Sequence, residues 1–293
     1  MRAQRWMVAA LGLAMLLAVS AVVWAQLPLE PPHDSGNSVT GAFEGWYKND
    51  DGTFSILVGY YNRNLKEALD IPVGPQNHVD PGGPDLGQPT HFVPGRQWGV
   101  FTITVPKDFG DKKFTWTIVA NKKSTVIPVN LNVLWEVSPF IEASGNTPPF
   151  LSFDEGGAWV QGPPRKVVKE YTASVSSPLT LTAWVADDGK GAGAAAAAGM
   201  RVRGAPMFLT WSKFRGPGDV TFEHVKPSLE KVETKSPATA PFVAKGTTTA
   251  TFSKPGDYIL EALANDLSGD GGRGFQCCWS TAQVKVVVKA GGL

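Results

Sequence analysis

The chain has 293 residues, of which 43% are apolar, 10% aromatic and 18% charged, and its formal net charge is +1. This composition supplies enough apolar side chains to fill a core, and the length predicts two domains. The 27 basic and 26 acidic residues nearly cancel, which excludes the strongly basic surface that nucleic-acid binding requires.

The first 25 residues follow the order of a secretory signal peptide. Two arginines precede an uncharged apolar stretch at 6–24, and the small residues Val23 and Ala25 stand before a cleavage site at Gln26. An uncleaved membrane anchor is the alternative interpretation. Cleavage predicts a periplasmic or extracellular protein without a transmembrane segment, because no later stretch is apolar enough to span a bilayer.

Residues 26–37 are predicted to form an extended leader, and residues 38–137 a first β-sandwich domain. Its strand candidates are rich in β-branched and aromatic residues and lie at 41–47, 53–62, 97–105, 114–120 and 125–134. Residues 49–52 (NDDG) predict a hairpin turn. Residues 65–96 contain six prolines, and we expect this long loop to be an ordered flap with a function.

Residues 138–149 are polar, end in two prolines and predict a linker. Residues 150–290 then predict a second β-sandwich of about seven strands with Greek-key connections. Its strand candidates lie at 167–175, 179–186, 206–213, 220–224, 247–252, 259–264 and 282–288. The predicted fold class is therefore all-β, with two sandwich domains after a signal peptide.

Part of the second domain carries a family resemblance. The run FSKPGDYILEALANDLSG (252–269) resembles the end of an immunoglobulin-like domain of the PKD or cadherin-like kind, and TAWVADDG (182–189) resembles an earlier strand of such domains. The resemblance implies that Tyr258 is a corner tyrosine whose hydroxyl bonds to the upstream backbone. No cysteine pair bridges the sheets, unlike in antibody domains. The first domain is similar to exported bacterial proteins without an assigned function.

Two long loops of the second domain are expected to meet at one end of the sandwich. Residues 266–271 resemble the first half of a calcium loop, and Asp187 and Asp188 could add carboxylates to Asp266 and Asp270. The sequence therefore raises calcium as a possible cofactor. Cys277 stands where a calcium loop has glutamate, so a polar turn remains the alternative.

Cys277 and Cys278 are the only cysteines of the chain, and they are adjacent. Export to an oxidising compartment predicts a disulfide between them, with a reduced pair or a soft-metal site as alternatives. The neighbouring side chains of Arg273, Phe275 and Trp279 predict a binding surface around this pair. In the alternative, the two aromatic rings fold back and cap the sandwich.

The first domain offers two further candidates. His78 and His91 could bind a metal ion within the flap, or they could be solvated loop residues. Tyr60 and Tyr61 are adjacent in a strand, so their side chains point to opposite faces and one of them could stack on a sugar ring.

The common motifs of nucleophilic, zinc-dependent and nucleotide-dependent enzymes are missing from the sequence. The sequence therefore predicts a non-catalytic, exported binding or adhesion protein that recognises a protein or a glycan. The alternatives are a carbohydrate-binding accessory protein and a metal-dependent enzyme that uses residues 65–96.

Overall fold

The computed structural model describes residues 33–142, 145–190, 207–266 and 278–291. The predicted signal peptide and leader up to residue 32 lie outside these ranges. The described chain consists of strands and turns with one short 3-10 helix, η1 (Val133–Trp135), so the predicted all-β fold class is confirmed. No helix among the described residues is long and apolar enough to cross a membrane.

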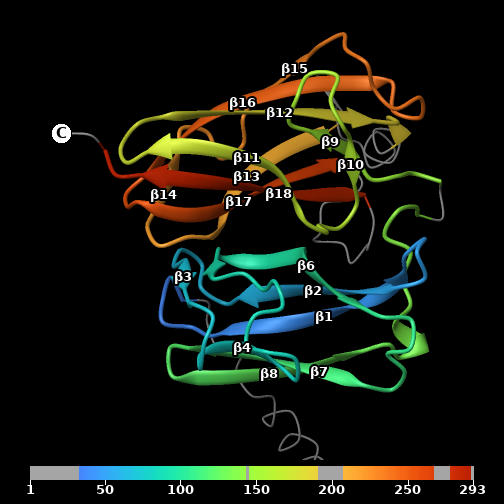
Figure 1. The fold of residues 1–293 in the computed structure, drawn as a ribbon, viewed down its shortest axis with the longest axis vertical. Helices are drawn as coiled ribbons and strands as arrows, with labels where there is room; N and C mark the ends of the chain where they lie inside the picture. The colour runs from blue at the N-terminus through green and yellow to red at the C-terminus, as the bar shows by residue number, and fades with distance from the viewer. Residues whose placement is uncertain (1–32, 143–144, 191–206, 267–277, 292–293) are drawn as a thin grey trace, which may run out of the picture. The chain divides into compact units, whose positions relative to one another are not determined.

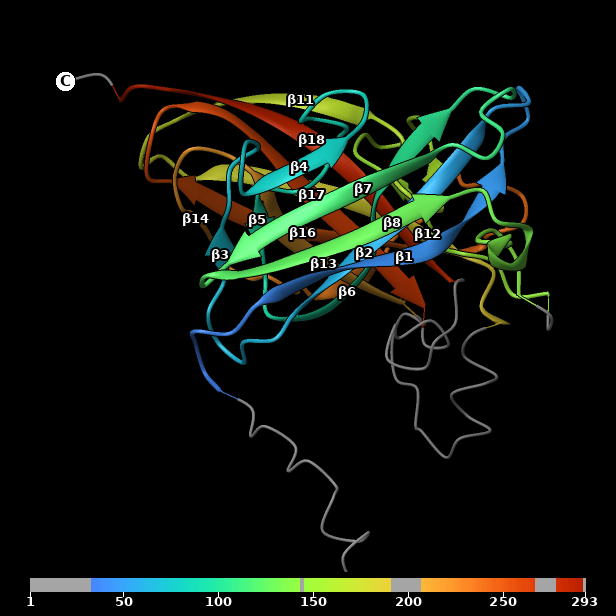
Figure 2. The same ribbon diagram turned by 90° about the horizontal axis from the view of Figure 1, so that it is seen from below.

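The first sandwich pairs two three-stranded sheets, β1-β2-β6 and β4-β7-β8 (Figure 1). Their strands are β1 (Val39–Lys48), β2 (Phe54–Asn62), β4 (Asn77–Asp80), β6 (Gly95–Val105), β7 (Lys113–Ala120) and β8 (Lys123–Asn130). Figure 2 shows β4 and β8 on either side of β7. The predicted turn between β1 and β2 is confirmed, because Gly52 has φ +83° and Asn49 N–H donates to the Thr53 carbonyl at 2.8 Å.

The core of the first sandwich follows from the alternation of its strands. On β2 the side chains of Ile56, Val58 and Tyr60 point inward, and they pack with Trp116 and Ile118 of β7. Each of these residues is nearly or fully buried. Alternate residues of a strand face the same side, so Ile56, Val58 and Tyr60 share this core, while Leu57 between them is buried on the other face of β2.

Residues 65–96 contain more regular structure than the expected flap. They form β3 (Leu69–Asp70), β4 and β5 (His91–Phe92), and β4 extends the sheet by pairing with β7. Phe92 is fully buried and lies 6.3 Å from the Trp116 ring. The buried side-chain amide of Asn77 donates to the carbonyls of Ile71 and Pro89. It therefore links the backbone before β4 to the backbone before β5. These long-range contacts order a segment whose prolines and glycines interrupt any visible periodicity.

The second sandwich has the strand order of an immunoglobulin-like domain. One sheet runs β10-β9-β12-β16-β14, with β15 also paired to β16, and the other runs β11-β18-β17-β13. The bounds are β9 (Phe150–Ser152), β10 (Val160–Gln161), β11 (Val167–Ser174), β12 (Leu179–Asp187), β13 (Met207–Arg215), β14 (Val220–Phe222), β15 (Leu229–Lys231), β16 (Phe242–Phe252), β17 (Gly256–Asp266) and β18 (Trp279–Lys289). In the second sheet, β11 comes first along the chain and β18 comes last. These two strands are neighbours and pair in parallel, whereas the other pairs of that sheet are antiparallel.

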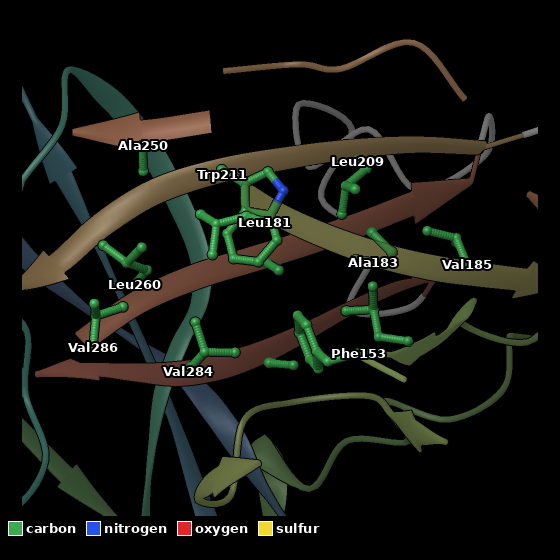
Figure 3. Packing of buried hydrophobic residues seen from close by; sticks show 14 of the residues in the cluster. Phe153, Leu181, Ala183, Val185, Leu209, Trp211, Ala250, Leu260, Val284 and Val286 are labelled. Atoms are coloured by element: carbon green, nitrogen blue, oxygen red, sulfur yellow. The ribbon is translucent and has the colours of Figure 1, made fainter. Parts of the chain in front are cut away.

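Trp211 lies at the centre of the second core and is fully buried. Figure 3 shows its ring between the two sheets, with Leu181 of β12 and Leu260 of β17 close by. The predicted tyrosine corner is confirmed, since the Tyr258 hydroxyl donates to the Lys254 carbonyl at 2.8 Å and the side chain is fully buried.

Candidate functional site

The structure brings three of the four predicted calcium ligands to one end of the second sandwich. Asp187 ends β12 and Asp266 ends β17, and both are almost completely buried. Burial, together with the negative charges of Asp266 and Asp188, raises the pKa of Asp187 to about 7. Asp270, the fourth predicted ligand, lies outside the described residues.

Hydrogen bonds already engage much of this acidic cluster. Asp187 Oδ1 accepts from Gly189 N–H at 2.8 Å, while its Oδ2 is buried and makes no hydrogen bond. Asp188 Oδ2 accepts from the Thr147 hydroxyl at 3.1 Å and lies 3.6 Å from Lys190 Nζ. Asp266 Oδ2 accepts from the Asn146 amide at 2.6 Å. In the part of the chain that the structure describes, no group of three or more His, Cys, Asp or Glu side chains is arranged to hold a metal ion.

The predicted surface around the cysteines is corrected at two positions. Cys278 is fully buried, and its φ is +87°. Trp279 is 3% exposed, and its ring covers Gly99 of β6, where a Cβ atom would lie 2.7 Å from the indole nitrogen. Cys278 and Trp279 are therefore packing residues rather than contact residues. Arg273, Phe275 and Cys277 lie outside the described residues, so the ring between the two cysteines stays a prediction.

The two histidines of the first domain bind different carboxylates, which corrects the prediction of a shared metal site. His78 Nε2 lies 3.2 Å from Asp80, and His91 Nδ1 lies 2.9 Å from Asp70. Asp70 also accepts from Nζ of Lys213, a buried lysine of β13, at 2.8 Å. His91 therefore belongs to an ionic cluster that fastens β3 and β5 to the second sandwich.

The ionic cluster strongly favours the charged form of Asp70. Partial burial opposes ionisation, but the hydrogen bonds and charges of His91 and Lys213 lower the pKa of Asp70 to about 2. A second contact of the same kind lies nearby, where Arg215 of β13 binds Asp85 at 2.7 Å. Both contacts join residues 65–96 to β13.

The tyrosine pair divides between the two faces of β2, as the pleat requires. Tyr60 is 3% exposed and its hydroxyl accepts from Val93 N–H at 2.9 Å, so Tyr60 is removed from the candidate contact residues. Tyr61 is 41% exposed. The guanidinium of Arg63 lies 5.3 Å from the centre of the Tyr61 ring, so this surface aromatic already has a partner.

The strongest exposed apolar feature was not predicted from the sequence. Val133, Leu134 and Trp135 of η1 are 72%, 86% and 47% exposed, and we call these three residues the apolar knob. We expected residues 125–134 to form a strand, but β8 ends at Asn130 and a helical turn follows. The signal was available, because three consecutive apolar residues break the alternation that precedes them.

The apolar knob is held rigidly on the first sandwich. The Asn132 side chain caps η1 by accepting from Leu134 N–H at 2.9 Å. The Trp46 indole donates to the Asn132 carbonyl at 2.8 Å, and the Trp46 carbonyl accepts from Val137 N–H at 2.9 Å. The Trp135 ring lies 5.4 Å from the Phe43 ring. Both ends of the turn are therefore anchored to β1.

A shallow cavity with a mostly apolar lining, which we call the apolar pocket, opens at the same end of the first sandwich. Its volume is about 510 Å³, and it is lined chiefly by Pro81, Pro106, Phe109, Phe114, Lys112 and Lys113. The Phe109 and Phe114 rings stack at 5.3 Å. Lys113 pairs with Asn130 across β7 and β8, and Asn130 precedes the cap of η1 by two residues. This register places the pocket and the knob at one end of the sheet.

Comparisons with known proteins do not assign this chain to a family or a function. No protein-family model and no curated protein sequence matches this chain. Among solved structures, the chain is similar to the D00-D0 domain of intimin (13% identity, TM-score 0.24, covering 85% of this chain and 100% of that one). It is also similar to the titin tandem domains A164-A165 (12% identity, TM-score 0.20, 87% and 100%) and to domains 4 and 5 of the S-layer protein SbsC (10% identity, TM-score 0.22, 86% and 98%). At these TM-scores the likenesses carry no argument about function.

Proposed function

We propose that this chain is an exported, non-catalytic binding protein that contacts a protein partner through the apolar knob. The observation that carries the proposal is the exposure of Val133, Leu134 and Trp135 on a turn whose two ends are anchored. Apolar surface in water costs roughly 25 cal/mol per Å², so covering these side chains favours association. A turn that is already ordered also loses little conformational entropy on binding.

The chemistry of the knob favours a protein over a glycan. Val133 and Leu134 are aliphatic, and their side chains complement an apolar protein pocket rather than the hydroxyl-rich faces of a sugar. A glycan would call for flat, freely accessible rings. The one ring of the knob, Trp135, packs against Phe43 at 5.4 Å, and the exposed ring that was predicted for this role, Tyr61, is paired with Arg63. The carbohydrate-binding alternative therefore has less support than the protein-binding one.

A photo-crosslinking experiment tests this proposal. A photoreactive amino acid replaces Leu134 in the exported chain, and irradiation of the producing cells is followed by mass spectrometry of the adducts. We expect a discrete adduct with a protein chain. The matched control carries the same amino acid at Val225, which is 49% exposed on the second sandwich and should give no such adduct. Absence of any protein adduct at position 134, or adducts with glycans alone, would contradict the proposal.

A further inference from the structure

We infer that the partner of the apolar knob is a second copy of this chain, whose apolar pocket receives the knob. The inference rests on the proposed function, because it names the occupant of the same contact surface. Two complementary features at one end of the first sandwich carry it: a projecting group of apolar side chains and a recess with an apolar lining.

The pocket is suited in chemistry and size to such a guest. Pro81, Pro106, Phe109 and Phe114 supply its apolar walls, and its volume of about 510 Å³ lies in the range of ligand pockets in proteins. Leu134 is the most exposed residue of the knob at 86%, so its side chain leaves the largest fraction of its surface to be covered. Insertion of Leu134 would cover the part of the Phe114 ring that is still exposed, since Phe109 is already almost completely buried.

Charges beside the two features are also complementary. Lys112 and Lys113 line the pocket, and both are exposed. Glu136 follows the knob directly and is exposed as well. Within the described ranges, Lys112, Lys113 and Glu136 form no ion pair. The two lysines stay unpaired even though Asp108 and Asp111 lie in the same loop. A knob entering the pocket of another copy would bring Glu136 towards the two lysines.

The placement of both features permits a closed dimer. The register of β7 with β8 sets Lys113 opposite Asn130, so pocket and knob belong to one end of the same sandwich. In a two-fold dimer each copy offers the same surface to the other, so two knobs can enter two pockets reciprocally. Such an interface leaves no unpaired knob and closes at two copies.

The first test measures self-association by sedimentation equilibrium of the mature chain over about 1 to 100 μM, a range that covers affinities of standard protein contacts. We expect a monomer–dimer equilibrium. Leu134→Asp should raise the dimer dissociation constant by roughly tenfold or more, as loss of a central apolar contact does. Val225→Asp introduces the same charge at an exposed valine of the second sandwich and should leave the constant unchanged. A chain that stays monomeric over this range would overturn the inference.

A charge-exchange series tests the pairing directly. Glu136→Lys and Lys113→Glu should each weaken the dimer, because each places like charges against the opposite copy. The double variant should return the dissociation constant to within roughly threefold of the wild type, since the pair is restored in reverse. Both positions are exposed, so folding should be preserved in all three variants, which circular dichroism can check. Failure of the double variant to recover the dimer would overturn the pairing.

Cross-linking from position 134 separates this inference from the proposed function. An adduct between two copies that maps to residues 106–114 supports both statements. Adducts with a different protein alone overturn the self-association and leave the binding function in place. No protein adduct of any kind overturns both.

Discussion

Replacement of Glu261 by glutamine should make the protein more stable in neutral solution and leave its stability in acid unchanged. Glu261 lies on the face of β17 opposite to Tyr258, Leu260 and Ala262, whose side chains fill the second core. Its Oε2 atom is buried and makes no hydrogen bond. Desolvation by burial raises the pKa of Glu261 from 4.5 to about 8, although a hydrogen bond with Gln283 acts in the opposite direction.

The pH dependence follows from the proton that the folded chain retains. Below pH 4.5 the carboxyl is protonated in both the folded and the unfolded chain, so it does not affect stability. Between pH 4.5 and about 8 the unfolded chain releases this proton and the folded chain keeps it. The free energy of unfolding therefore falls by about 1.4 kcal/mol for each pH unit in this window. Relative to its value below pH 4.5, the free energy of unfolding is therefore lower by about 3 kcal/mol at pH 7 and by roughly 5 kcal/mol above pH 8.

Urea unfolding of the mature chain at several pH values between 4 and 8 measures this effect. Glutamine has the shape of the protonated carboxyl and does not ionise, so the variant should diverge from the wild type as pH rises. The control is Glu230→Gln on β15, where the side chain is exposed. A stability difference between wild type and Glu261→Gln that is the same at pH 4 and pH 8 would refute the reasoning.

Four further outcomes can be checked. Tyr258→Phe removes the corner hydrogen bond and should lower the free energy of unfolding by about 1 kcal/mol, measured by urea unfolding. Asp70→Asn leaves the buried Lys213 without its carboxylate and should cost about 2 kcal/mol at pH 7; an unchanged midpoint would show that the ionic cluster adds nothing. Mass spectrometry of the exported protein should find a mature terminus at or near Gln26. The two adjacent cysteines should react with an alkylating reagent only after mild reduction, and two free thiols in freshly purified protein would exclude their disulfide.

Local patterns in the sequence determined most of the strand content. The alternation in 53–62 and 179–186 and the turn residues 49–52 describe contacts between near neighbours, and the structure has strands and a hairpin there. The resemblance carried by residues 252–269 implied the tyrosine corner, whose hydrogen bond spans only four residues. Short strands such as β4 and β9 carried no comparable signal, since their stability comes from the strands beside them.

Which residues face solvent was decided by the tertiary structure. The sequence could state that Tyr60 and Tyr61 point to opposite faces, but not which face another layer covers. Trp279 and His91 have side chains typical of binding sites, but both contact segments of this chain that are distant in sequence. Trp279 packs on Gly99, and His91 binds Asp70. The reverse holds for the apolar knob. Its three side chains, Val133–Trp135, are of the kind that usually fills a core, but they are exposed to solvent on the turn that Asn132 caps. Sequence patterns report spacing along the chain, whereas exposure depends on partners that long-range packing brings together.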